Sequence, residues 1–270
     1  MTGGTMGAGS GGVQSGTGGD DSGRSGGAGG SGGSGGRTEP GSGGTAGAAG
    51  ANPPAFTALS IDFIGGRSPS TGAGGADLVS SHVMSPTEIA GVKPAAHWNG
   101  AMGAMGVLTN LVLSNGVAIP AVVTWSSPAT AASPGVWDHG YADAEGDVRM
   151  MNGYLDPLTP AMPATVVVAG LPLAITAAGY DVYLYVSGDI RSSTTRTGRY
   201  NIGATSFAAS EMGPTSAFAG FILASQGGFG NYIVFKNQTG ASFTLIATPG
   251  TTTPSRAPVD GIQIVSPAGS

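Results

Sequence analysis

The sequence predicts an all-β protein, a two-sheet antiparallel β-sandwich of the jelly-roll type. Three observations predict this class. Short runs rich in β-branched and aromatic residues are bounded by Gly, Pro, Asn or Asp, some of them alternate apolar and polar residues with a period of two, and helical periodicity is almost absent. Every Phe, Trp and Tyr lies at or after residue 56, so the core must come from the later part of the chain.

The first 50 of the 270 residues contain 23 Gly and no aromatic residue. Glycine loses the most backbone entropy on folding and has no side chain to bury, so residues 1–51 are expected to form a disordered Gly/Ser-rich tether. An ordered polyglycine-type assembly is the alternative, and it needs many parallel chains to satisfy the backbone hydrogen bonds. Residues 52–270 are long enough to form one sandwich domain.

The strand segments share high β-propensity and flanking turn residues. In chain order they are 56–63, 107–113, 121–125, 164–168, 180–186, 199–202, 217–223, 232–235, 242–247 and 259–265.

The segment 180–186 shows the alternation most clearly. Val182 and Leu184 fall on one face, which is expected to enter the core. Tyr183 and Tyr185 fall on the other face, where their hydroxyls are expected to reach water or a ligand. One short helix is expected within 146–155, where apolar residues recur at helical spacing.

Composition excludes several functional classes. The net charge is −5 and the ten Lys and Arg residues are scattered, so nucleic acid is not an expected partner. No run of apolar residues is long enough for a membrane span, so membrane insertion is not expected either. The chain has no Cys, which excludes thiolate chemistry and Cys-based zinc sites.

The cellular location follows from composition alone. The first ten residues lack the basic and apolar regions of a signal peptide. A Gly/Ser tether ahead of a Cys-free, Thr-rich β domain is nevertheless typical of exported proteins, so an extracellular or cell-surface location is expected.

Some segments match the sequence patterns of enzyme motifs but lack the structural context that these motifs need. Residues 7–12 match the dinucleotide-binding pattern, and residues 23–27 and 29–33 match the nucleophile elbow. Both motifs work only at a turn between a strand and a helix, and the glycine-rich segment predicts neither element. The sequence therefore predicts that the chain is not an enzyme.

The densest acidic cluster contains Asp138, Asp143, Glu145 and Asp147. Carboxylate oxygens in this crowding are ligands that Ca²⁺ prefers, and the ion would offset their mutual repulsion. We therefore predict a calcium site from these four residues. A solvated acidic loop preceding a short helix is the alternative, and a carboxylate pair for glycoside hydrolysis is a third interpretation.

Aromatic residues in loops are candidates for stacking on sugar rings. Trp98 with its neighbour Asn99, and Trp137 with Tyr141 beside the acidic cluster, are the predicted ligand-binding residues. A Trp in such a loop can instead plug the end of the core, which is the alternative for Trp98.

Arg196 completes the predicted ligand-binding set. With Arg191 and Arg199 it forms the densest basic group of the chain, which could grip an acidic sugar. A solvated hairpin loop balanced by Asp189 is the alternative.

Seven segments carry a resemblance to a known class of module. They are LSIDF at 59–63, GVKPAAHWN at 91–99, GDVRMMNGYL at 146–155, YDVYLY at 180–185, TGRY at 197–200, GNYIVF at 230–235 and RAPVDGIQIV at 256–265. The chain resembles the galactose-binding-like jelly-roll modules of large secreted and surface proteins of environmental bacteria. This resemblance implies extracellular binding of carbohydrate or a cell-surface polymer without catalysis. A structural subunit of a surface fibre, layer or adhesive matrix, capable of self-assembly, is the alternative, and a polysaccharide-acting hydrolase ranks third.

Overall fold

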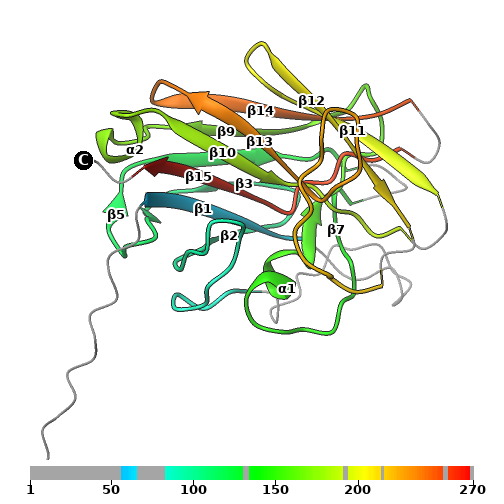
Figure 1. Cartoon of the computed structure of the whole chain (residues 1–270), viewed down its shortest axis with the longest axis horizontal. Coiled ribbons are helices and arrows are strands. Elements are labelled where there is room, and N and C mark those ends of the chain that lie inside the picture. Colours follow the sequence, from blue (N-terminus) through cyan, green and yellow to red (C-terminus); the bar gives the residue numbers. More distant parts are fainter. Residues whose placement is uncertain are drawn as a thin grey trace, which may run out of the picture. The chain divides into compact units, whose positions relative to one another are not determined.

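The computed structural model describes residues 56–65, 83–129, 134–190, 194–213, 216–251 and 255–267 (Figure 1). All of these belong to the predicted sandwich domain. The tether expected over residues 1–51 lies outside the described residues, so that assignment stays a prediction.

One sheet has five strands. Their order is β13 (Tyr232–Gln238), β10 (Tyr180–Tyr185), β15 (Gly261–Pro267), β1 (Phe56–Gly65) and β2 (Asn99–Met102). Strand β1 pairs with β15 in antiparallel and with β2 in parallel orientation, and the other pairs are antiparallel.

The second sheet has six strands and is antiparallel throughout. Their order is β12 (Thr205–Met212), β11 (Thr195–Ile202), β14 (Ser242–Pro249), β9 (Ala164–Ala169), β6 (Val122–Ser126) and β3 (Met105–Leu108). The remaining elements are the pairs β4 (Leu111–Val112) with β5 (Ala118–Ile119) and β7 (Val136–Asp138) with β8 (Gly153–Leu155), and the helical turns α1 (Asp147–Met150) and α2 (Leu173–Thr176). The predicted all-β class with two sheets is confirmed, and their pairing is antiparallel except between β1 and β2.

The main core lies between the sheets and is built from alternate residues of each strand. Phe63 of β1 packs edge-on against Trp125 of β6, with ring centroids 6.1 Å apart. Gly106 of β3 lies beside this indole, and a Cβ there would stand 2.5 Å from the ring. The absence of a side chain at 106 is therefore what admits Trp125.

The outer face of the five-stranded sheet is covered near α1. Tyr185 is fully buried there, accepts a hydrogen bond from the Val92 amide at 2.8 Å and donates one to Gln263 Oε1 at 2.9 Å. The expectation that this face of β10 is open to water or a ligand is thus wrong at Tyr185. Residues of the segment 84–98 and of α1 cover it, among them Trp98 and Met150.

Three local predictions differ from the structure. Segment 107–113 is divided between β3 and β4 at Asn110, whose φ of 56° interrupts a strand. Segment 217–223 is not a strand and makes only a single bridge, from Leu223 to Tyr232. The helix expected over 146–155 is the single turn α1, after which the chain enters β8.

Within the described ranges, no helix reaches the length and apolarity needed to cross a membrane.

Candidate functional site

A pocket of about 510 Å³ lies where three turns of the sandwich meet the segment 216–231. Its floor and sides come from the loop after β7, the turn after β10 and the end of β12. Its lining includes Tyr141, Ser187, Glu211, Phe218, Ile222 and Phe229. The volume lies within the range typical of small-ligand sites.

The segment 216–231, which we call the strap, is fixed to one edge strand of each sheet. On β12, the Ser210 amide donates to the carbonyl of Gly228 at 2.9 Å. On β13, the Ala224 amide donates to the carbonyl of Tyr232 at 2.9 Å. Asn231 fixes the fold of the strap itself, because its side chain accepts from the amide of Ile222 at 2.7 Å. The strap is therefore a defined wall of the pocket.

The strap gives the pocket an apolar side. Ile222 is 61% exposed and Phe229 is 54% exposed, although both are large apolar residues that line a pocket. Phe218 is held edge-on against Phe221, with ring centroids 5.1 Å apart. Exposed apolar groups gathered around a concavity are typical of a binding site.

The opposite side of the pocket is polar and rests on two neighbouring backbone amides. The Ser187 amide donates to Asp260 Oδ2 at 2.6 Å, and the Gly188 amide donates to Glu211 Oε2 at 2.6 Å. The other oxygen of Glu211 is buried and has no hydrogen-bond partner among the described residues. Two carboxyl groups are thus held next to each other by consecutive residues of one turn.

Burial determines the protonation state of these carboxyl groups. It raises the pKa of Glu211 from 4.5 to about 8, with nearby Asp260 adding to the effect, while the Gly188 amide and Arg196 act in the opposite direction. Burial also raises the pKa of Asp260 well above its usual range. At neutral pH the Glu211 carboxyl is therefore protonated, and it can donate as well as accept a hydrogen bond.

His139 lies behind this polar side. Its ring stacks on Tyr141 with centroids 4.5 Å apart, and its Nε2 is 3.5 Å from Asp260 Oδ1. Burial lowers the pKa of His139 to about 4, so the imidazole is neutral at physiological pH. The stacked ring holds Tyr141 at the pocket wall.

Only some of the predicted ligand-binding residues lie at the pocket, and the others make contacts elsewhere in the domain. Tyr141 lines the pocket. Arg196 donates to the Asp189 carbonyl at 2.8 Å and acts electrostatically on Glu211. Trp137 is half-buried in β7, opposite Tyr154 of β8. Arg191, from the same basic group, lies outside the described residues.

Trp98 and Asn99 make framework contacts. Trp98 is buried, and its Nε1 donates to the Ala95 carbonyl at 3.0 Å. The Asn99 side chain donates to the carbonyls of Ser60 and Val112 and accepts from the Val112 amide. These are the contacts expected from the structural alternative for Trp98, and the ligand role of both residues stays a prediction.

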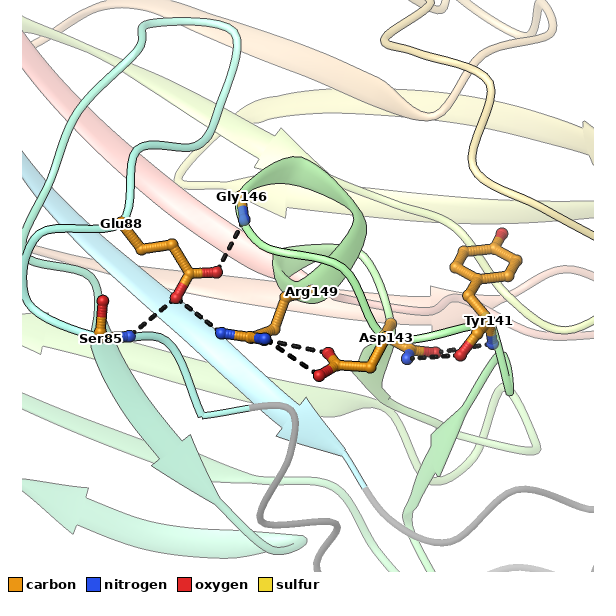
Figure 2. Close-up of polar contacts among 7 residues, drawn as sticks. Ser85, Glu88, Tyr141, Asp143, Gly146 and Arg149 are labelled. Atoms are coloured by element: carbon orange, nitrogen blue, oxygen red, sulfur yellow. Dashed lines mark hydrogen bonds and ion pairs between the residues drawn. The ribbon is translucent and has the colours of Figure 1, made fainter.

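Of the four predicted calcium ligands, Asp143 and Asp147 have different partners, and Figure 2 shows the partner of Asp143. Asp143 pairs with Arg149 through both oxygens, at 3.0 Å each, and Arg149 also donates to Glu88 at 2.9 Å. Asp147 accepts from the Gly91 amide at 2.7 Å. Asp138 is buried in β7, and Glu145 is exposed.

Glu88 organises this network from the other side. It accepts hydrogen bonds from the amides of Gly146 at 2.7 Å and Ser85 at 2.9 Å (Figure 2). The acidic loop is thus tied to the segment 84–98 through Arg149. In the part of the chain that the structure describes, no three His, Asp or Glu side chains form a group suited to a metal ion. Calcium binding stays a prediction.

The sequence interpretation missed the polar side of the pocket. Ser187, Glu211 and Asp260 come from three distant parts of the chain and meet only in the fold. One signal was available, because Glu211 is the only charged residue between Arg199 and Lys236. A single charged residue that lies in a strand within a long uncharged stretch needs a structural or functional reason.

No protein-family profile and no curated protein sequence matches the chain. Three solved structures match, all of an exo-β-1,3-galactanase from Phanerochaete chrysosporium. The structure with galactose is 15% identical over 42% of this chain and 23% of that one, with a TM-score of 0.25. Two structures of variants with β-1,3-galactotriose are each 12% identical, with TM-scores of 0.27 and 0.26.

These variant structures are matched over 60% and 52% of this chain, and over only 26% and 32% of their own length. TM-scores this low assign neither activity nor substrate to the present chain. The identity of the matched structures does correct one expectation. The chain was predicted not to be an enzyme, whereas the solved structures that it matches are those of a glycoside hydrolase, so the non-catalytic assignment is not retained.

Proposed function

We propose that the sandwich domain binds carbohydrate by seating a sugar unit in the pocket beneath the strap. The observation that carries this proposal is that exposed apolar side chains and a buried carboxyl group line the same pocket. Phe229 and Ile222 offer the apolar surface, and Glu211 and Tyr141 offer the polar one.

Sugars present both an apolar and a polar kind of surface. Their C–H faces pack on aromatic rings, while their hydroxyls need partners that both donate and accept. Protonated Glu211 meets the second need without placing a net charge in the pocket. The resemblance of the sequence to galactose-binding-like modules supports the same class of ligand.

An extracellular or cell-surface location belongs to this proposal. It rests on the Cys-free composition and on the Gly/Ser-rich segment that precedes the domain. The polymer would be a polysaccharide of a cell wall or matrix.

Hydrolysis of a glycosidic bond is the second candidate function. The protonated carboxyl of Glu211 has the state required of a general acid, and Asp260 lies on the neighbouring amide. The reaction also needs a second carboxyl that is ionised. Burial raises the pKa of Asp260 as well, which disfavours the ionised form that the reaction needs, so we rank binding before hydrolysis.

Affinity electrophoresis of the full chain through gels containing neutral polysaccharides tests the binding proposal. The wild-type protein should be retarded by at least one polymer, and Phe229→Ala should weaken that retardation at least about fivefold because the stacking surface is lost. Leu173→Ala is the matched control, since it truncates a residue that is 78% exposed in α2 outside the pocket. Equal loss in both variants, or no retardation by any polymer, would refute the proposal.

The same polymers test hydrolysis. Release of reducing ends from a polymer that binds, abolished in Glu211→Gln while retardation persists, would establish the second candidate. Retardation without release would leave binding as the function of this pocket.

A further inference from the structure

A second concavity lies on the six-stranded sheet and shares no lining residue with the sugar pocket. It consists of two hollows of about 460 and 480 Å³. Both are lined by Pro160, Gly250 and Thr251, so they form one continuous groove, which we call the arginine groove.

The charge of the arginine groove differs from that of the chain. Its described lining contains Arg199 and Arg256 and no Asp or Glu, whereas the chain as a whole carries a net charge of −5. Its other polar groups include the Thr248 and Thr251 side chains. Two guanidinium groups beside hydroxyls are an arrangement suited to an anion.

Arg199 is placed on β11 with its charge available. Its cross-strand neighbours are Thr248 of β14 and Ala208 of β12, both uncharged. No ion pair among the described residues involves Arg199, and its guanidinium approaches Ser206 Oγ only at 3.5 Å. An exposed guanidinium without a carboxylate partner can accept an incoming anion without first breaking a salt bridge.

Arg256 has a carboxylate partner, and the two side chains of this pair differ in their exposure to solvent. Its Nε lies 2.8 Å from Asp156 Oδ1, and the side chains are 24% and 4% exposed respectively. The carboxylate is therefore on the inner side and the guanidinium on the outer side. The ion pair fixes the guanidinium in the lining of the groove, while Asp156 offsets part of its charge, so Arg199 is the main positive group of the groove.

We propose that the arginine groove binds an anionic sugar unit, bearing a carboxylate or sulfate group, of a polysaccharide. The planar guanidinium of Arg199 would meet the anionic group through two parallel N–H···O bonds, which an ammonium group cannot do. The two joined hollows provide room for the neighbouring units of a polymer. Because the net charge of the protein opposes polyanions, retention must come from this local site.

Affinity electrophoresis of the full chain against dextran sulfate, polygalacturonate and neutral dextran tests the inference. At least one of the two charged polymers should retard the protein, neutral dextran should retard it less, and added salt should weaken the retardation. Retardation by one charged polymer alone identifies the anionic group as carboxylate or sulfate. Arg199→Gln should weaken the retardation about tenfold, as expected for loss of one charge-assisted bidentate contact.

Two variants make the result specific. Lys236→Gln removes the same charge from the exposed surface of β13, outside the groove, and should change retardation less than about twofold. Arg199→Lys keeps the charge but loses the planar guanidinium. Its retardation by the charged polymers should lie between that of wild type and that of Arg199→Gln. Equal effects of Arg199→Gln and Lys236→Gln would show that only net charge matters and would overturn the inference. Absence of retardation by both charged polymers would also overturn it.

The inference is independent of the sugar pocket. Phe229→Ala should leave retardation by the charged polymers unchanged, because Phe229 does not line the arginine groove. If the pocket proposal is wrong, retardation by the neutral polymers should be missing while retardation by the charged polymers persists.

Discussion

Replacing Glu211 by Gln should make the folding stability of the domain less dependent on pH. The wild-type carboxyl keeps its proton in the folded state up to a pH of about 8, whereas in the unfolded chain it releases the proton near pH 4.5. Between these values the folded state binds more protons than the unfolded state, so stability falls as pH rises. The stabilisation is complete below pH 4.5 and is lost as pH rises through about 8.

The magnitude follows from the two pKa values. At about 1.36 kcal/mol per pH unit, the interval from 4.5 to about 8 corresponds to at most about 5 kcal/mol of stability lost between pH 4 and pH 9. Gln cannot ionise, and its side-chain oxygen can still accept the Gly188 amide. The variant should therefore gain stability relative to wild type at alkaline pH and not at acidic pH.

Urea unfolding of both proteins at intervals from pH 4 to pH 9 measures this difference. Asp62 and Asp260, whose pKa values burial also raises, contribute slopes of the same sign in both proteins. His139 contributes the opposite sign between pH 4 and 6.5, because burial lowers its pKa to about 4. The Asp62 and His139 terms cancel in the comparison, whereas the Asp260 term cancels only in part because Asp260 contributes to the raised pKa of Glu211. Identical pH profiles for wild type and Glu211→Gln would refute the burial argument, and the exposed Glu145→Gln is the control.

Three further substitutions test contacts that hold the domain together, and chemical denaturation measures the change in the free energy of unfolding for each. Arg149→Ala should cost about 3 kcal/mol, because it leaves the carboxylate of Glu88, 3% exposed, without its ion-pair partner; a loss below about 1 kcal/mol would contradict this. Gly153→Ala should destabilise the domain by more than about 3 kcal/mol, since its Cβ would stand 1.9 Å from the Ile64 carbonyl oxygen. Trp98→Phe should cost about 1 kcal/mol through loss of the buried indole hydrogen bond. It should also leave polysaccharide retardation unchanged, and weaker retardation would instead support the predicted ligand role of that residue.

The strands that could be predicted from the sequence are those with a strong local pattern. The alternation in 180–186 identified β10, and the apolar run in 259–265 identified β15. Strand β12 was missed because its small and polar residues resemble a loop, and its stability comes from pairing with β11 along its whole length. Segment 217–223 has strand-like residues but is held as part of the strap.

The site was less accessible to sequence reasoning than the fold. Tyr141 was found because aromatic residues beside a polar cluster can be recognised locally. Glu211 and Asp260 become neighbours only through the backbone turn at Ser187 and Gly188, and no spacing in the sequence encodes that meeting. In the same way, Arg196 was chosen from the basic group, whereas the structure places Arg196 on the Asp189 carbonyl and leaves Arg199 exposed in the lining of the arginine groove.

The strap also has a consequence for association between chains. Strands β12 and β13 stand at the ends of their sheets, and strap residues hydrogen-bond to the backbone of both. An uncovered edge strand is a template for pairing with a second chain, so the strap protects β12 at Ala208 and Ser210 and the first residue of β13, Tyr232, against such pairing. A second chain that adds as a strand at the opposite ends of the sheets, at β2 or β3, would not have to displace the strap.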